Sequence, residues 1–312
     1  MALIIEEPLM NSMDKLFEKF DTSFKQKVKC TKCKKKCSNF CPDGCLGYTQ
    51  NKIPDYGCNY LRNAYVLRYF PTHKAELQKL YEINTTQIFS HISLNKRQDQ
   101  LVLLGLGAGP GTDLIAFCEW LNQHNSDIDK RLSVTFIRAD ANDDWKIQYD
   151  NLKNIFKSSF VSVKADFAFR KRIVDAFDAT KWPKNTHVTS ASYLISELIS
   201  KNNISDCKQQ ISYFWDTFKE KTDARSIILI NDRPEEDVRA ISKHLANLVK
   251  TTYKKSQYKE YCFNKDCFQD AAGITLNNDK WCGCHLPDDM RKKYKSKTVC
   301  NSYQGIIFAN KS

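Results

Sequence analysis

The stretch LVLLGLGAGPGTDL, Leu101–Leu114, decides the fold of this chain. It opens as a continuous apolar run, which is typical of a strand buried on both faces of a parallel sheet. Glycines follow at alternate positions, and Leu114, Ile115, Cys118 and Leu121 then recur at helical spacing. A strand that turns into a helix through glycines lets a ligand approach bare backbone, because no Cβ blocks it. The stretch therefore predicts a turn that holds a nucleotide cofactor.

The spacing of the glycines indicates which kind of nucleotide cofactor the turn would bind. A dinucleotide turn needs G-x-G-x-x-G, and a phosphate loop needs a lysine before its Ser or Thr. Here Gly107, Gly109 and Gly111 alternate, and no lysine precedes Thr112. In this pattern the turn resembles motif I of the class I S-adenosylmethionine-dependent methyltransferases, which reads roughly acid-x-Gly-x-Gly-x-Gly. The acid of that motif falls on Gly105 in this chain.

The resemblance covers about residues 100–310. It implies an α/β fold, with a Rossmann-like seven-stranded, mostly parallel sheet and an antiparallel last strand. It also implies that S-adenosylmethionine lies on the turn, with an acid at the end of the second strand on the ribose and an acid with an apolar neighbour in the third strand on the adenine. The implied cofactor-binding residues are Gly105, Gly107, Gly109, Gly111, Thr112, Asp113, Asp140, Asp166 and Phe167.

Strand and helix patterns alternate after the turn, as in a parallel sheet with crossover helices. The strands are expected at 132–140, 160–167, 186–197, 226–232, 258–263 and 304–309. Two helices are expected before the turn, one ending ahead of Pro71 and one over 73–92. Ligands of open α/β sheets bind at the carboxyl ends of the strands. We therefore expect Tyr193, Glu197 and Asp232 to line the catalytic opening.

Charge points to a polyanionic partner. The 312 residues carry a net charge of +12, and basic clusters favour contact with nucleic acid. Lys32, Lys34, Lys35 and Lys36 belong to a lysine-rich run without acids, and 291–297 is a second basic run. No apolar run approaches the roughly 20 residues that cross a bilayer. The first residues lack the basic region of a secretory signal, so we expect a cytoplasmic or nuclear protein without a membrane partner.

Cysteines gather ahead of the predicted sheet, at Cys30, Cys33, Cys37, Cys41, Cys45 and Cys58. In a reducing compartment such spacing favours metal ligands over disulfides. Zinc is the first expectation and an iron–sulfur cluster is the alternative. We expect residues 1–58 to form a helical and Cys/Lys-rich metal-binding region, with a helix within 12–28. Residues 59–312 would form the methyltransferase-like domain.

A second cysteine-rich stretch, the insert at about 262–303, contains Cys282, Cys284 and His285. These side chains form a second metal site, complete the first one, or are buried thiols; their spacing leaves the three possibilities open.

Three functions agree with these features. The leading hypothesis is an S-adenosylmethionine-dependent methyltransferase that acts on RNA or on an RNA-associated substrate. The second is a catalytically inactive protein of the same fold that binds nucleic acid or assists assembly, which Gly105 in place of the acid favours. The third is a methyltransferase that acts on a protein or a small molecule, with the positive charge serving an acidic substrate. The sequence leaves the methylated atom, the metal and the oligomeric state open.

Overall fold

The computed structural model of the protein describes residues 15, 20, 56–57, 59–94, 100–124, 133–140, 142–156, 163–169, 185–265, 267–270, 275–277 and 300–311. Five predictions lie outside these residues: most of the helix within 12–28, the N-terminal metal site, the lysine run, the basic run at 291–297, and the group of Cys282, Cys284 and His285. Among the described residues, no cluster of His, Cys, Asp or Glu is arranged to hold a metal ion.

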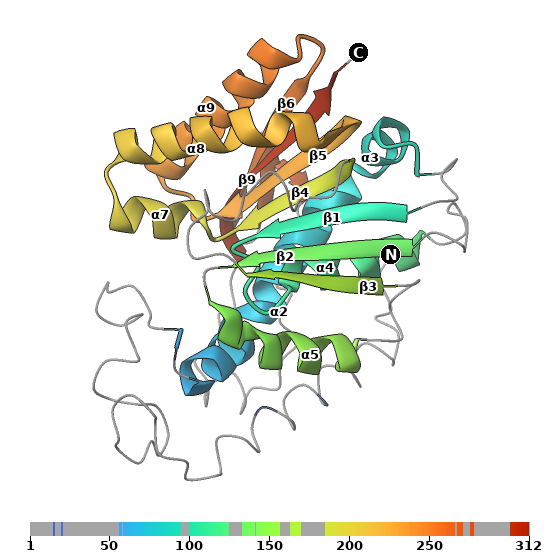
Figure 1. The fold of residues 1–312 in the computed structure, drawn as a ribbon, viewed down its shortest axis with the longest axis vertical. Coiled ribbons are helices and arrows are strands. Elements are labelled where there is room, and N and C mark those ends of the chain that lie inside the picture. The colour runs from blue at the N-terminus through green and yellow to red at the C-terminus, as the bar shows by residue number, and fades with distance from the viewer. Residues whose placement is uncertain are drawn as a thin grey trace.

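One sheet organises the described part of the chain (Figure 1). Its nine strands have the order β3-β2-β1-β4-β5-β9-β6-β7-β8. They are β1 (Gln100–Leu106), β2 (Ser133–Asp140), β3 (Val163–Phe169), β4 (Thr186–Ser192), β5 (Thr222–Asp232), β6 (Gln257–Lys265), β7 (Cys267–Asp270), β8 (Thr275–Asn277) and β9 (Cys300–Asn310).

The pairing of these strands confirms a mostly parallel, Rossmann-like α/β fold with an antiparallel last strand. Strands β3, β2, β1, β4 and β5 are parallel. The last strand, β9, runs between β5 and β6 and is antiparallel to both. The predicted count of seven strands was wrong, because the insert after β6 adds the short strands β7 and β8 at the edge of the sheet.

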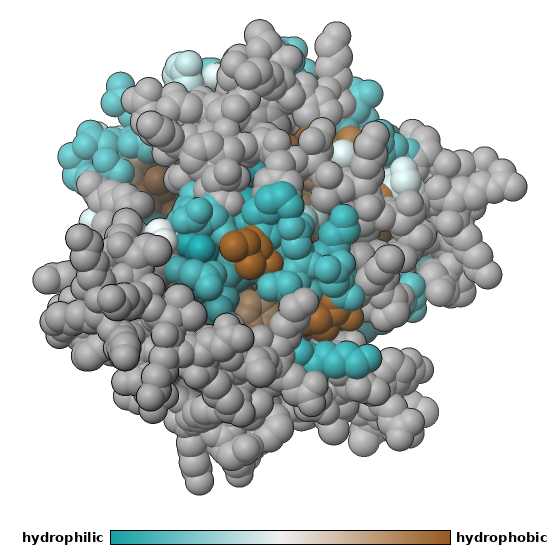
Figure 2. Space-filling view, turned by 60° about the horizontal axis from the view of Figure 1, so that its bottom comes forward, coloured by the Kyte–Doolittle hydropathy of each residue, from teal (hydrophilic) through white to brown (hydrophobic). Residues whose placement is uncertain are grey.

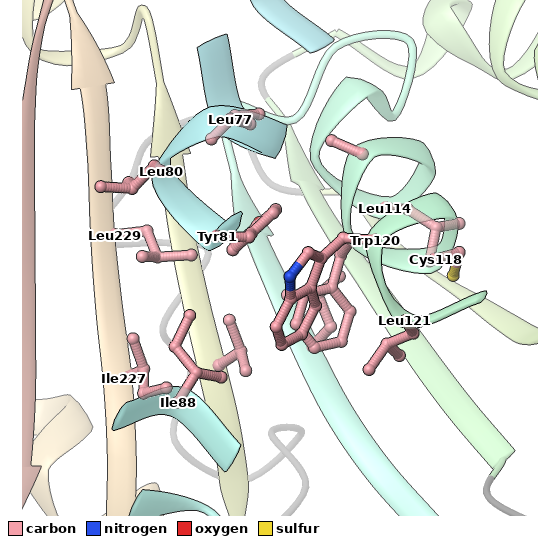
Figure 3. Close-up of a cluster of buried hydrophobic side chains, with 14 of the residues drawn as sticks. Leu77, Leu80, Tyr81, Ile88, Leu114, Cys118, Trp120, Leu121, Ile227 and Leu229 are labelled. Carbon is pink, nitrogen blue, oxygen red and sulfur yellow. The ribbon is translucent and has the colours of Figure 1, made fainter. Parts of the chain in front are cut away.

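Helices cover both faces of the sheet (Figure 1). One face packs against α2 (Asn59–Ile83), α3 (Thr85–His91) and α4 (Thr112–Gln123), and the other packs against α7 (Ile195–Lys201), α8 (Ile204–Phe218) and α9 (Glu236–Thr252). Helix α5 (Lys146–Ile155) follows a short 3₁₀ turn, Asp143–Trp145. Figure 3 shows Tyr81 of α2 beside Trp120 of α4, with Leu229 and Ile227 of β5 to the left of both. The apolar run of β1 is buried because helices enclose it on both faces.

Helix α2 overturns the prediction of a boundary at Pro71. It is one continuous helix of 25 residues with Pro71 inside it. A proline in a helix interior removes one backbone hydrogen bond and usually ends or kinks the helix. Here Phe70 and Leu77 on either side of the proline are fully buried, as are several neighbours. Packing against α4 and the sheet therefore outweighs the local preference of the proline.

The described surface is predominantly polar. Figure 2 shows one face on which hydrophilic residues surround a few hydrophobic ones. Among the described residues, Ile147 and Tyr213 are the large hydrophobic side chains that lie exposed. None of the described helices combines the length and the apolar character that crossing a membrane requires.

Candidate functional site

The glycine turn leaves β1 where the order of the sheet reverses. Strand β1 pairs with β2 on one side and with β4 on the other, so successive crossovers leave it in opposite directions. In open α/β sheets this switch point, at the carboxyl ends of the strands, is where ligands bind. Gly107, Gly109 and Gly111 all have positive φ, at 58°, 47° and 86°. The turn is closed by a hydrogen bond of 2.8 Å from the amide of Gly111 to the carbonyl of Ala108.

Two side chains of β2 hold the turn through Gly109. The amide of Gly109 donates to Asp140 Oδ2 at 2.7 Å, and Arg138 Nη1 donates to the carbonyl of Gly109 at 2.8 Å. The other carboxylate oxygen of Asp140 accepts from the amide of Asn142 at 2.8 Å. Arg138 is buried and also lies over the ring of Tyr149. Asp140 was predicted to end the second strand, and it does so beside the turn.

Three of the four glycines are explained by close contacts within the protein. A Cβ at Gly105 would lie 2.8 Å from the Cβ of Ala108, and one at Gly107 would lie 2.8 Å from a methyl group of Leu194. At Gly111 it would lie 2.6 Å from the ring of Tyr149. The first of these contacts also explains the departure from motif I, because no acidic side chain fits at position 105 without moving its neighbours.

Asp113 connects the start of α4 to β4. The carboxylate oxygen Oδ1 accepts hydrogen bonds from Ser190 at 2.6 Å and from Ser192 at 2.7 Å. The side chain is almost fully buried. Burial raises the pKa of Asp113, and the two serine hydroxyls oppose that rise because they stabilise the charged form. Thr112, the first residue of α4, is also buried. Their predicted contact with a cofactor stays a prediction.

A buried polar group joins α2 to the ends of β4, β5 and β9. Glu76 of α2 accepts a hydrogen bond from Tyr193 Oη at 2.9 Å and one from Asn231 Nδ2 at 3.3 Å. Gln304 Nε2 donates to Asn231 Oδ1 at 3.0 Å and to the backbone carbonyl of Glu76 at 2.7 Å. Glu76, Asn231 and Gln304 are fully buried. We refer to Glu76, Tyr193, Asn231 and Gln304 as the carboxyl-end polar group.

Tyr193 lies at the centre of this group in a constrained conformation. Its φ is 54°, an uncommon value for a tyrosine, and its amide donates to the carbonyl of Asn231 at 2.7 Å. Its ring stacks on His73 of α2, with the centroids 3.6 Å apart. Burial, and then the nearby Glu76 carboxylate, raise the pKa of Tyr193 well above its ordinary value. The phenol therefore stays protonated at neutral pH, and its O–H group donates the hydrogen bond to Glu76.

His73, Glu76 and Gln304 were missed by the analysis of the sequence. His73 and Glu76 are three residues apart in α2 and therefore share one side of the helix. A polar pair beside the apolar Leu77 and Leu80 is the signal that marks them. Gln304 gave no such signal, since it lies 228 residues away from Glu76 in the chain.

Glu197 and Asp232 both lie at the start of α7. Strand β4 ends at Ser192, so the prediction of a strand as far as Glu197 was wrong; Glu197 is in the first turn of α7. Its Oε1 accepts from Tyr56 Oη at 3.1 Å. Asp232 ends β5, and its Oδ2 accepts from the amides of Ile195 and Ser196 at 2.8 and 3.1 Å. These bonds start the helix at Ile195, because they satisfy amides that have no partner within it.

Burial raises the pKa of Asp232, while its hydrogen bonds to Ser196 and neighbouring amides lower it. The catalytic roles of Glu197 and Asp232 stay predictions. The local geometry nevertheless gives the Asp232 carboxylate a defined structural task, which is to hold the start of α7 at the end of β5.

Asp166 and Phe167 occupy the middle of β3. The strand runs from Val163 to Phe169, with Asp166 paired to Ile137 and Phe169 paired to Asp140. The expectation that the strand ends at Asp166 and Phe167 was therefore wrong by two residues. Asp140, not Asp166, lies at the carboxyl edge. A role of Asp166 and Phe167 at the adenine remains a prediction.

Aromatic side chains gather beside the turn. The ring of Trp145 is the nearest neighbour that a Cβ on Gly109 would meet, at 3.8 Å. It packs against Tyr56 and Tyr65, with ring centroids 5.0 and 5.4 Å away. Tyr65 also contacts the ring of His73, which stacks on Tyr193, so the rings beside the turn are continuous with the carboxyl-end polar group.

No protein-family model and no curated protein matches the chain. Solved structures do match. The N-terminal domain of human METTL16 in complex with SAH has 10% identity and a TM-score of 0.42, over 76% of this chain and 70% of that one. Precorrin-6y C5,15-methyltransferase from Geobacter metallireducens has 12% identity and a TM-score of 0.37, over 72% and 86%. An S-adenosylmethionine-dependent O-methyltransferase from Thermotoga maritima has 8% identity and a TM-score of 0.35, over 72% and 65%.

Two of these proteins are methyltransferases by name, and the structure of the third contains SAH. The strand order, the antiparallel β9 and the glycine turn after β1 define a Rossmann-like, mostly parallel α/β fold.

Proposed function

We propose that this protein binds S-adenosylmethionine at the glycine turn and transfers the methyl group to RNA or to an RNA-associated substrate. One observation carries the proposal: the turn leaves β1 at the switch point of the sheet, with Asp140 directly beside it. That edge of an open α/β sheet is where nucleotide ligands bind, and an acid at the end of the second strand is suited to ribose hydroxyls.

The residues at the turn fit the ribose of this cofactor. Each oxygen of Asp140 accepts one backbone hydrogen bond, and a carboxylate oxygen has lone pairs for more than one. Asp140 would therefore accept from the ribose hydroxyls while it still holds Gly109. Bound S-adenosylmethionine would supply an electrophilic methyl group. A ligand that lies against Gly107 needs the side chain of Leu194 to move, because a methyl group of that leucine lies over the glycine.

The protein's own side chains would position the acceptor. The carboxyl-end polar group is fixed by four hydrogen bonds between side chains or to backbone, so it holds the ends of β4, β5 and β9 in one arrangement. Among the three predicted catalytic residues, Glu197 is partly buried and keeps a carboxylate near the start of α7, where it would accept a proton from the substrate. Tyr193 and Asp232 would act by positioning, since their polar atoms bind other parts of the protein.

The positive charge supports RNA as the substrate class. A net charge of +12 favours a polyanion, and contacts to phosphate hold a nucleic acid without reading its sequence. We propose that Lys32, Lys34, Lys35 and Lys36 make such contacts and that the neighbouring cysteines bind zinc or, alternatively, an iron–sulfur cluster. The cytoplasm or the nucleus would be the place of action.

A catalytically inactive protein of the same fold is the second candidate. Two observations favour it: Gly105 stands where the family has an acid, and Leu194 packs over Gly107. Such a protein would use the positive charge to bind nucleic acid or to assist assembly, without methyl transfer.

Titration calorimetry with S-adenosylmethionine and S-adenosylhomocysteine tests the proposal. We expect saturable binding to the wild type and at least about tenfold weaker binding to Asp140→Asn. The matched control is Asp150→Asn, which removes an acid of α5 that is 45% exposed and pairs with Lys146. Absence of binding to folded wild-type protein would overturn the proposal.

Transfer of a labelled methyl group to cellular RNA is the second readout. Cofactor binding together with labelled RNA supports the full proposal, and Glu197→Gln should then lower the rate without changing cofactor affinity. Cofactor binding without transfer to RNA or to RNA-bound protein would instead favour the inactive protein.

A further inference from the structure

A second site candidate lies at the opposite end of the sheet. A cavity of about 330 Å³ opens between α3, the start of β5, the start of β6 and the end of β9. Arg225 lies in β5 seven residues before Asp232, which places the cavity roughly 23 Å from the carboxyl ends of the strands. It is therefore separate from the glycine turn. In Figure 1 this region is at the end of the sheet next to α3.

The lining of the cavity is basic. Among the described residues it contains Arg225, Lys255, His91, one serine, three carboxamide side chains and Phe308, and none of these is a carboxylate. Both Arg225 and Lys255 are exposed, and neither forms an ion pair with another described residue. The nearest acid in the sequence, Asp223, accepts from the amide of Arg225 and lies 3.5 Å from His187. Two cations thus line one hollow, and none of the described residues in its wall carries a negative charge.

His91 makes the wall of the cavity rigid. Its Nε2 lies 3.1 Å from the carbonyl of Ser226 in β5 and 2.9 Å from the carbonyl of Ala309 in β9. A ring nitrogen between two carbonyl oxygens must carry the proton, so the tautomer is fixed. Burial lowers the pKa of His91, and the ring is therefore neutral at pH 7. One side chain thereby ties α3 to two strands, and it holds the cavity open.

A second connection closes the other side. Gln87 of α3 donates from Nε2 to Gln257 Oε1 of β6 at 2.9 Å. The side-chain amide nitrogen of Gln257 donates no hydrogen bond to another described residue. A carboxamide donor next to an arginine and a lysine is a suitable partner for anionic oxygens.

We infer that this cavity binds a phosphate monoester on a small organic group, such as a free mononucleotide or the phosphorylated end of an RNA. A monoester carries nearly two negative charges at neutral pH, which two cations match. Arginine binds phosphate oxygens with a planar fork, and lysine adds a point charge. The volume lies at the lower end of the range of small-molecule pockets and exceeds what a bare phosphate ion fills.

Calorimetry or fluorescence anisotropy at low and physiological salt tests the inference. The probes are AMP, adenosine, and one short RNA with either a 5′-phosphate or a 5′-hydroxyl. We expect wild-type protein to bind AMP in preference to adenosine, and the paired variant Arg225→Gln with Lys255→Gln to lose at least about tenfold in affinity. Because both side chains are exposed, the melting temperature of the variant should equal that of the wild type.

Two control variants separate recognition from net charge. Lys250→Gln removes an exposed cation in the last turn of α9 and should leave the affinity for AMP unchanged. Arg225→Lys keeps the charge but removes the fork, and we expect an intermediate loss. An equal loss in Lys250→Gln and in the paired variant would overturn the inference, as would wild-type protein that binds AMP no better than adenosine.

The RNA probes identify the source of the phosphate. Tighter binding of the 5′-phosphorylated RNA than of AMP, with loss in the 5′-hydroxyl RNA, would assign the cavity to RNA ends. Equal affinity for AMP and the phosphorylated RNA would assign it to a free nucleotide. Neither result depends on S-adenosylmethionine, so these experiments test the inference independently of the proposed methyl transfer.

Discussion

Asp140 and Gly109 are joined by a hydrogen bond of 2.7 Å from the glycine amide to the aspartate carboxylate. The last residue of β2 thereby fixes the turn that follows β1. Arg138 holds the carbonyl of the same glycine, so both backbone polar groups of Gly109 are bound by one strand. The turn is thus tied to β2 by hydrogen bonds within the protein.

Replacing Asp140 should therefore reduce stability as well as ligand binding. Asp140→Ala leaves the amides of Gly109 and Asn142 without their acceptor, and we expect a loss of about 1–3 kcal/mol in the free energy of unfolding. Urea denaturation measures it. Asp150→Asn, which changes an exposed acid on α5, should stay within about 0.5 kcal/mol of the wild type. Equal stability of Asp140→Ala and wild type would contradict the fixed turn.

Two glycines of the turn should differ in their tolerance of alanine. Gly109→Ala meets its nearest atom at 3.8 Å, so only its positive φ of 47° is unfavourable, which costs about 1–2 kcal/mol. Gly111→Ala has a φ of 86° and also places its methyl group 2.6 Å from the ring of Tyr149. Overpacking should add about 1–3 kcal/mol. A lower melting temperature for Gly111→Ala than for Gly109→Ala is the expected order, and the reverse order would refute this account.

Removing one partner of the buried ion pair between α2 and α4 should destabilise the protein more than removing both partners. Lys74 Nζ lies 2.6 Å from Glu119 Oε2, and both side chains are at most 6% exposed. Glu119→Leu leaves a buried cation, for which we expect a loss of about 3–5 kcal/mol. Adding Lys74→Met should restore most of it.

A double-mutant cycle by urea denaturation measures this coupling. The exposed pair of Lys146 and Asp150 on α5 is the control and should contribute less than about 0.5 kcal/mol. If Glu119→Leu and the double variant were equally unstable, the pair would not act as a unit.

Asp113 should make the stability of the protein fall as the pH rises. Burial raises its pKa in the folded state, so between about 4, the unfolded value, and the folded pKa the native protein binds more protons than the unfolded chain. Stability from this group is present at low pH and is lost as the pH rises through that window.

Asp113→Asn removes this titration and preserves an oxygen for Ser190 and Ser192. Relative to the wild type, the variant should gain stability as the pH rises above about 4 and should reach a constant difference once Asp113 is charged. Urea denaturation of both proteins from low to neutral pH measures the difference. A constant difference over the whole range would show that the pKa of Asp113 is not raised.

Local patterns predicted the parts of the site that lie on one segment. The apolar run and the glycines gave β1 and its turn, and the end of the next apolar run gave Asp140 at the end of β2. The same logic failed where packing between distant segments decides. Pro71 suggests a helix end, but α2 continues because its neighbours are buried.

Glu197 was placed in a strand, yet the side chain of Asp232 accepts a hydrogen bond from the first residue of a helix there. The glycines themselves indicated a ligand. In the structure, three of them are also required because a Cβ would clash with the side chains of Ala108, Leu194 or Tyr149. Glu76, Asn231 and Gln304 meet only when the ends of the chain fold together, and no spacing rule reaches across such separations.

The side chain of Leu194 lies next to Gly107 in the glycine turn. A methyl group of Leu194 lies 2.8 Å from the place where a Cβ on Gly107 would stand, so a ligand that approached the glycine from this side would compete with the leucine. The affinity that an experiment measures is then the intrinsic affinity reduced by the fraction of molecules in which the leucine has moved away. Shortening the side chain of Leu194 would then raise the measured affinity without adding a contact to the ligand. A low affinity of the native protein would reflect competition between Leu194 and the ligand.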